Sequence, residues 1–154
     1  MLTRKATLED LPQLSNLFDQ YRSFYHKESD IEGAGNFLKK RLENQDSEIF
    51  VAEENGILTG FTQLYPLFSS TRMKRYWLLN DLFVNENHRG KGHSKALIES
   101  AKELCIATKA CGILLETDKT NEIGNQLYPS NMYPLCFTVI NHFNIFCQVC
   151  EIRR

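Results

Sequence analysis

The chain is most informative over residues 82–97, which read Leu82-Phe83-Val84-Asn85-Glu86-Asn87-His88-Arg89-Gly90-Lys91-Gly92-His93-Ser94-Lys95-Ala96-Leu97. An apolar strand here leads into a basic loop with two glycines, and the loop opens a helix. Glycine lets the backbone curl so that several N–H groups point into one concavity, and a helix start adds about half a positive charge. The segment therefore predicts a cradle for an anion such as a pyrophosphate.

Two familiar phosphate-binding motifs do not fit this loop. A P-loop has a lysine directly after its last glycine, but Gly92 is followed by His93. A dinucleotide-binding fingerprint that begins at Gly90 needs a glycine or alanine where Lys95 stands. The anion site therefore belongs to another class of phosphate-binding loop.

The segments around the loop alternate between strand and helix patterns. Upstream, the sequence predicts a strand over Leu2–Ala6, a helix from Leu8 to Phe24 with Thr7 as its N-cap, a helix over Ala34–Glu43, a hairpin of Ser47–Glu53 and Ile57–Phe68, and a central strand over Arg75–Asn85. Downstream, it predicts a helix over Ser94–Lys109, a strand over Gly112–Glu116, a short helix over Glu122–Ser130 and two end strands within Leu135–Val149.

This order of elements predicts an α/β fold. We expect one domain over residues 1–154, with a mixed, mostly antiparallel sheet of about seven strands and helices on both faces. The length suits a single compact core.

The composition excludes several classes of protein. Of the 154 residues, 42% are hydrophobic and 24% are charged, and the formal net charge is -1, which is typical of a soluble globular protein. The lack of basic excess argues against a nucleic-acid partner. The sequence has no run of membrane-spanning length, so we expect no membrane association and a cytoplasmic location.

The five cysteines favour reduced thiols over a disulfide framework, because their number is odd. Cys147 and Cys150 form a close pair, but a zinc site would need a second pair of ligands. We therefore expect no metal, although metal or redox use of this pair is the alternative.

The pattern Arg-x-x-Gly-x-small, filled by Arg89, Gly92 and Ser94, resembles the acetyl-CoA pyrophosphate loop of the GNAT N-acetyltransferase superfamily. Downstream, Asn121-x-x-Gly124-x-x-Leu127-Tyr128 is similar to the Asn-x-x-Ala-x-x-Leu/Phe-Tyr helix of that family. The resemblance covers the chain as far as about Tyr133. It implies the GNAT fold and transfer of an acetyl group from acetyl-CoA to a primary amine of a small molecule.

Two other functions stay open. The chain could acetylate lysines or N-termini of peptides or proteins, or it could be a catalytically weak sensor that binds acyl-CoA without turnover.

The resemblance also implies which residues bind the cofactor. Backbone groups of the central strand would bind the pantetheine arm, the loop would bind the pyrophosphate, and the downstream helix would add amide side chains. The expected residues are Leu82, Phe83, Val84, Arg89, Gly90, Lys91, Gly92, His93, Ser94, Asn121 and Asn125.

Three residues are candidates for proton transfer. By resemblance, the Tyr128 hydroxyl lies near the leaving thiolate and serves as the general acid. Asp81 and Glu116 lie on adjacent strands and are the candidate general bases. Plainer roles are a core position for Tyr128 and a structural hydrogen bond or solvent contact for Asp81. After Tyr128, Met132 replaces the usual glycine of the family, and two prolines flank that turn.

The acceptor amine would contact Tyr25, Tyr65, Trp77 and Asn80, because aromatic walls suit cationic or apolar amines. Some of these rings could instead belong to the core. Diamine-acetylating members carry an acidic residue where Asn80 stands, which argues against polyamines. Many family members form dimers through their last strands, so we expect a homodimer.

Overall fold

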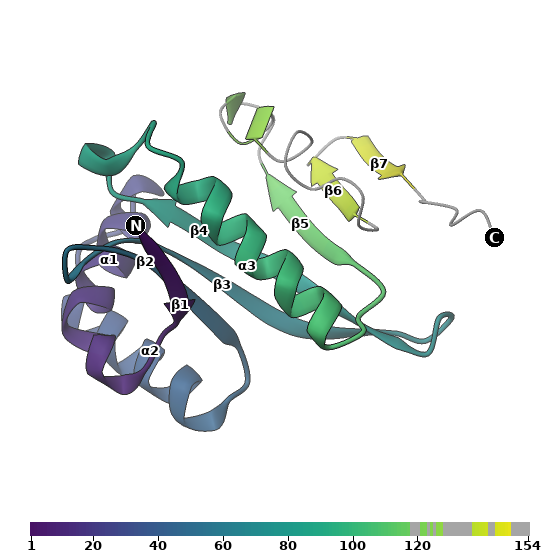
Figure 1. The fold of residues 1–154 in the computed structure, drawn as a ribbon, viewed down its shortest axis with the longest axis horizontal. Coiled ribbons are helices and arrows are strands. Elements are labelled where there is room, and N and C mark those ends of the chain that lie inside the picture. The colour runs from purple at the N-terminus through teal and green to yellow at the C-terminus, as the bar shows by residue number, and fades with distance from the viewer. Residues whose placement is uncertain (118–120, 123, 125, 128–136, 142–143, 149–154) are drawn as a thin grey trace.

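The structure, a computed structural model, describes residues 1–117, 121–122, 124, 126–127, 137–141 and 144–148 (Figure 1). Three long helices and two short 3-10 turns accompany the strands in this part of the chain. In chain order the elements are β1 (Leu2–Lys5), a 3-10 turn (Leu8–Asp10), α1 (Leu11–Phe24), α2 (Ile31–Asn44), β2 (Glu48–Glu54), β3 (Ile57–Ser69), β4 (Lys74–Val84), a 3-10 turn (Glu86–His88), α3 (His93–Ala107), β5 (Ile113–Thr117), β6 (Phe137–Asn141) and β7 (Asn144–Gln148).

The described strands form one mixed sheet in the order β1-β2-β3-β4-β5-β6-β7. The first four strands pair antiparallel, as do β6 and β7. The β4–β5 and β5–β6 pairs are parallel. A crossover through α3 joins β4 to β5, as a parallel pair requires. The predicted mixed, mostly antiparallel α/β fold is confirmed.

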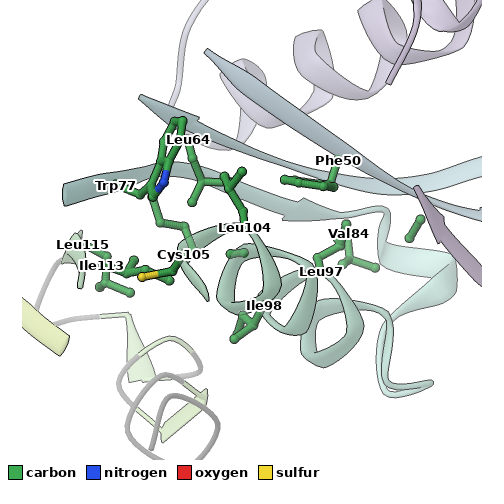
Figure 2. Close-up of a cluster of buried hydrophobic side chains, with 13 residues drawn as sticks. Phe50, Leu64, Trp77, Val84, Leu97, Ile98, Leu104, Cys105, Ile113 and Leu115 are labelled. Atoms are coloured by element: carbon green, nitrogen blue, oxygen red, sulfur yellow. The ribbon is translucent and has the colours of Figure 1, made fainter. Parts of the chain in front are cut away.

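Helices cover both faces of the sheet, and β2 shows how one strand serves both (Figure 1). Ile49 and Val51 pack in the cluster beneath α1 and α2, whereas Phe50 and Ala52 pack in the cluster beneath α3. Side chains alternate between faces along a strand, so a strand buried on both sides is apolar throughout. Figure 2 shows the α3 cluster, in which Trp77 lies among the aliphatic side chains.

Polar side chains fix the boundaries of the first two helices. The Asp30 carboxylate accepts a hydrogen bond from the Gly33 N–H at 2.8 Å, so α2 begins at Ile31, one turn before the predicted start. Asp19 accepts hydrogen bonds from the Ser29 hydroxyl at 2.6 Å and the Asp30 N–H at 2.7 Å. Because Asp19 belongs to α1, these two hydrogen bonds fix the position of the loop between α1 and α2.

An ion-pair network joins β1 to the neighbouring strand β2 and to the 3-10 turn that follows β1. Arg4 donates two hydrogen bonds of 2.8 Å to Asp10 and also contacts Glu53 at 2.8 Å. The Asp10 carboxylate accepts a hydrogen bond from the Thr7 N–H at 2.7 Å. Thr7 is therefore the N-cap of the 3-10 turn over Leu8–Asp10, and not of α1 as predicted. The Arg4 guanidinium and these bonds hold the pKa of Asp10 below its usual range.

In the described part of the chain, no helix combines the length and the apolar character needed to cross a bilayer.

Candidate active site

The sheet opens between β4 and β5. Their pairing runs from Trp77–Ile113 to Leu79–Leu115, but β4 continues to Val84 and β5 to Thr117. The register between β3 and β4 shifts at this point and leaves Asn80 as the extra residue of a bulge. Bulges bend a strand and often lie beside active sites. The two strand ends therefore diverge on the carboxyl side of the sheet.

A cavity of about 340 Å³ occupies this opening. Its walls come from the end of α1, the divergent ends of β4 and β5, the loop before α3, the first turn of α3 and the segment after β5. The lining residues are Tyr21, Phe24, Tyr25, Leu79, Asn80, Leu82, Phe83, Val84, His88, Arg89, Gly90, His93, Ser94, Glu116, Thr117, Asn121, Gly124 and Leu127.

The backbone of β4 presents hydrogen-bonding groups to this cavity. The N–H of Asn85 bonds to Thr59 on the β3 side, whereas the carbonyl of Val84 accepts Arg89 Nε at 3.0 Å on the opposite side. Backbone groups alternate between the two edges of a strand in an antiparallel ladder. The N–H and C=O of Val84 and Leu82 therefore point towards β5, as the pantetheine prediction requires.

The loop before α3 is shaped by two glycines in the left-handed region, Gly90 at φ +75° and Gly92 at φ +86°. A Cβ added at either glycine would meet no atom within 4 Å, so backbone conformation rather than crowding favours glycine there. Gly92 is the N-cap of α3. The N–H groups of the first turn, which includes His93 and Ser94, have no partner inside the helix.

The basic side chains of the loop partly support its own backbone. Arg89 lies with its guanidinium 5.9 Å from the centre of the Phe83 ring while it bonds to Val84. Lys91 Nζ donates to the carbonyl of Asn87 at 3.2 Å and is exposed. Arg89, Gly90, His93 and Ser94 line the cavity, and Lys91 and Gly92 lie in the same loop.

Asn121 and Gly124 form one local unit on the β5 side. Asn121 Oδ1 accepts the Gly124 N–H at 2.9 Å, and Asn121 Nδ2 donates to Thr117 Oγ1 at 3.1 Å. A Cβ at Gly124 would lie 2.6 Å from Asn121 Nδ2. A side chain at this position would therefore require the Asn121 amide to move. Both residues line the cavity, whereas Asn125 lies outside the described residues.

Asp81 is a buried carboxylate with 6% of its surface exposed. Both carboxylate oxygens lie 3.1 Å from Asn80 Nδ2, and Tyr21 also hydrogen-bonds to the group. Burial raises the pKa of Asp81 above its ordinary value, and the bonds from Asn80 and Tyr21 oppose that rise. Tyr21 and Asn80 line the cavity, so they separate Asp81 from it.

The second predicted base, Glu116, lines the cavity directly and is exposed. The predicted general acid, Tyr128, lies outside the described residues. Its neighbour in sequence, Leu127, lines the cavity.

The aromatic acceptor residues divide between two locations. Tyr25 lies at the end of α1 with its ring 5.1 Å from that of Tyr21, and both line the cavity with Phe24. Tyr65 faces the α1 side near Asp81, and burial raises its pKa to about 12. Trp77 is 2% exposed in the α3 cluster, where Nε1 donates to Thr108. The structure therefore places Trp77 in the core, outside the cavity lining.

A second polar cluster lies beside the loop, and sequence analysis missed it. His93 Nδ1 lies 2.6 Å from the hydroxyl of Thr59, which is the extra residue in a bulge between β2 and β3. His88 Nδ1 lies 3.3 Å from Glu54 Oε2. Burial lowers the pKa of His93, with the charges of Glu54, His88 and Lys91 as smaller influences. No sequence pattern indicates this grouping, because Glu54 and Thr59 come from a hairpin distant in the chain.

Comparison with known proteins identifies the fold and its chemistry. A model of the acetyltransferase (GNAT) family matches residues 11–132. The chain is 47% identical over 133 residues to the uncharacterized N-acetyltransferase YhfO of Bacillus subtilis, covering 86% of this chain and 89% of that protein. It is 34% identical over 113 residues to a probable acetyltransferase of Haemophilus influenzae, covering 73% of this chain and 77% of that one.

A solved structure agrees with these sequence relatives. The crystal structure of a probable acetyltransferase superposes with a TM-score of 0.80 at 40% identity, and the match covers 84% of this chain and 88% of that one. The open β4–β5 edge, the glycine loop and the helix start thus occur in a chain whose relatives are named acetyltransferases. The chain belongs to the acetyltransferase (GNAT) family.

Proposed function

We propose that this acetyltransferase transfers the acetyl group of acetyl-CoA to a primary amine of a small molecule. The observation that carries the proposal is one continuous cavity that joins the glycine loop, the β4–β5 opening and the aromatic end of α1. The loop supplies an anion site at one end, and the Tyr21–Asp81 pair supplies a route for a proton at the other.

The residues around the loop fit the diphosphate of acetyl-CoA. Gly90 and Gly92 allow the backbone turn, and the first turn of α3 offers unpaired N–H groups next to Ser94. The guanidinium of Arg89 adds positive charge at the cavity wall. The outward backbone groups of Leu82 and Val84 would bind the pantetheine arm as a strand-like partner.

In the proposed reaction the amine nitrogen attacks the thioester carbonyl carbon, the C–N bond forms, and the C–S bond breaks. A backbone N–H of Leu82 or Val84 would stabilise the oxyanion. The proton of the ammonium would pass to the Tyr21 oxygen while the Tyr21 hydroxyl proton passes to Asp81. The leaving thiolate would take a proton from Tyr128, and the second proton that the nitrogen loses from the tetrahedral intermediate would restore the Tyr128 hydroxyl.

The acceptor end of the cavity suits a cationic or partly apolar amine. Tyr21, Phe24 and Tyr25 offer aromatic faces and edges, and Glu116 adds a carboxylate. Aromatic rings bind ammonium groups through cation–π contacts. Asn80 lines the cavity and bonds to Asp81, and it would contact the acceptor. An acidic residue at this position would bind the second ammonium group of a diamine, which asparagine does not favour.

Thiol release from acetyl-CoA tests the function across polyamines, amino acids, aminoglycosides and lysine peptides. We expect turnover with one class of small amine and its loss in Asp81→Asn. Binding of acetyl-CoA without any turnover would favour the sensor alternative.

One observation favours peptides as a second candidate class of acceptor. Phe24 and Tyr25 are 59% and 52% exposed, so the aromatic end of the cavity could also receive a side chain from a larger partner. Turnover of lysine peptides without turnover of free amines would select this alternative.

We further propose a cytoplasmic homodimer. The cytoplasm supplies acetyl-CoA and keeps thiols such as Cys105 and Cys111 reduced. In the described sheet β7 is an edge strand, which could pair with a second copy.

A further inference from the structure

We propose that Glu54, His88 and His93 form a binding site for a divalent transition-metal ion of the zinc class. The three residues come from the end of β2, the 3-10 turn after β4 and the first position of α3. Each can offer one ligand atom, and these atoms all lie within 4.8 Å of one another. None of the three residues is among the acceptor residues proposed above.

The spacing of the cluster fits metal coordination. Zinc lies about 2.0–2.1 Å from nitrogen and oxygen ligands, so two ligands of a tetrahedral site are about 3.3 Å apart. The distance from His88 Nδ1 to Glu54 Oε2 is 3.3 Å. Protein N–H···O hydrogen bonds are most common at about 2.9–3.0 Å. The His88–Glu54 distance is therefore long for a hydrogen bond, but it matches the distance between two ligand atoms bound to the same zinc ion.

The hydrogen bonds of Thr59 prepare His93 as a ligand. The Thr59 hydroxyl donates its single proton to the carbonyl of Ala52 at 3.1 Å. The hydroxyl oxygen also lies 2.6 Å from His93 Nδ1 and accepts from it in the tautomer that carries its proton on Nδ1. In that tautomer His93 Nε2 has a free lone pair for a metal ion. Metal-bound histidines are held in this way, with the second ring nitrogen donating to an outer partner.

The donor set selects the class of ion. Two imidazoles and one carboxylate suit zinc and its first-row neighbours better than calcium or magnesium, which prefer oxygen ligands. Three protein ligands leave a coordination position for water or another exchangeable group. His88 and His93 also line the cavity, so the ion would border the proposed diphosphate site. Lys91 and the N-terminal amine lie close enough to affect His93 electrostatically and would weaken the binding of a cation.

Titration of the full-length protein with Co²⁺ tests the site without any activity measurement. Under a non-chelating reductant we expect visible d–d absorption without the strong charge-transfer band of a cobalt–thiolate bond. Zn²⁺ should displace Co²⁺ and abolish the absorption. A dominant thiolate band would overturn the proposal, because it would assign the ion to cysteines.

Variants locate the ion. His88→Ala and Glu54→Gln should each weaken Zn²⁺ binding at least about tenfold in competition with a chromophoric chelator, since even outer-shell changes cost 10–100-fold. Thr59→Val should also weaken binding, because it releases the His93 ring. The matched controls, His26→Asn and Cys147→Ser, should bind as the original chain does. Unchanged affinity in folded His88→Ala and Glu54→Gln, or loss only in Cys147→Ser, would overturn the proposal.

Discussion

The environment of Asp81 determines when this carboxylate can accept a proton. Burial favours its neutral form, whereas hydrogen bonds from Asn80 and Tyr21 favour the ionised form. Only the ionised form can take the proton of the acceptor amine. In the proposed mechanism, Asn80 therefore extends the activity of the base to lower pH.

The variant Asn80→Ala should shift the acidic limb of the kcat–pH profile to higher pH. It removes both 3.1 Å contacts to Asp81 without replacing them, so the pKa of Asp81 rises further and its carboxylate forms later in a titration. The kcat–pH profiles of the original chain and of Asn80→Ala are measured at saturating substrates with the same amine. Protonation of the amine then affects both profiles equally and does not contribute to the difference between them. A limb that stays in place or moves to lower pH would remove Asp81 from proton transfer.

Tyr128→Phe should lower kcat far more than it changes KM for acetyl-CoA. The change removes only the hydroxyl, which we propose protonates the leaving thiolate. Steady-state kinetics at saturating acceptor measure both constants. An unaffected kcat would assign Tyr128 a packing role instead.

Sequence alone predicted the backbone shape of the loop before α3 better than the positions of the side chains around the cavity. Arg89, Gly92 and Ser94 could be found because a glycine loop at a helix start has a local pattern. The core position of Trp77 could not be found, since an aromatic residue on a strand buried on both faces has no periodic signal. The separation of Asp81 from the cavity by Tyr21 and Asn80 depends on a bulge, and bulges have no clear sequence pattern here.

At the scale of elements, the N-terminal network holds β1 and the start of α1 against β2. Arg4 is about one third exposed and Asp10 is nearly buried, with side-chain exposures of 34% and 9%. The pair shares two hydrogen bonds of 2.8 Å. Such a charge-assisted pair contributes more than a fully exposed one, since the groups lose less to solvent screening.

Asp10→Asn should lower the free energy of unfolding by about 1–3 kcal/mol in urea titrations at neutral pH. The pKa of Asp10 is lowered in the folded state, so its stabilisation is present above the unfolded-state pKa and is lost as pH falls through the folded pKa. The difference in the free energy of unfolding between the original chain and Asp10→Asn should therefore shrink below about pH 4.

Glu48→Gln is the matched control for this variant. It breaks the Lys5–Glu48 pair, whose side chains are 61% and 30% exposed, and should change stability by less than about 1 kcal/mol. Equal losses in both variants, or a difference for Asp10→Asn that grows at low pH, would contradict this account of the network.

The element boundaries that the sequence predicted incorrectly have local causes. The second helix begins at Ile31 because the Asp30 side chain caps it, although the apolar pattern becomes regular only later. By contrast, the hairpin turn at Asn55 and Gly56 was predictable, since both residues adopt positive φ angles that asparagine and glycine tolerate.

At the scale of the whole molecule, we expect light scattering at micromolar concentration to give twice the chain mass of 17.9 kDa. The edge position of β7 offers backbone groups for pairing with a second copy. A mass of one chain over the same concentration range would rule out the proposed homodimer.

The architecture places two features at the same end of the sheet: the opening between β4 and β5, and the glycine loop before α3. The divergence of β4 from β5 opens a cavity, and the loop before α3, which we propose binds the diphosphate, lines one part of it. The order of strands, loop and helix was predictable because each element has its own pattern. The cluster of Glu54, His88 and His93 was not, because only tertiary packing brings these residues together.

Calorimetric titration of Gly92→Glu with acetyl-CoA tests the central assignment most directly. Glutamate at φ +86° strains the loop and adds a negative charge where the diphosphate is proposed to bind, so detectable binding should be lost. Gly56→Glu is the matched control, because Gly56 also has a positive φ of +78° and open space around it but lies in the β2–β3 turn. We predict that Gly56→Glu binds acetyl-CoA like the original chain, whereas an unchanged affinity in Gly92→Glu would contradict the assignment of the loop.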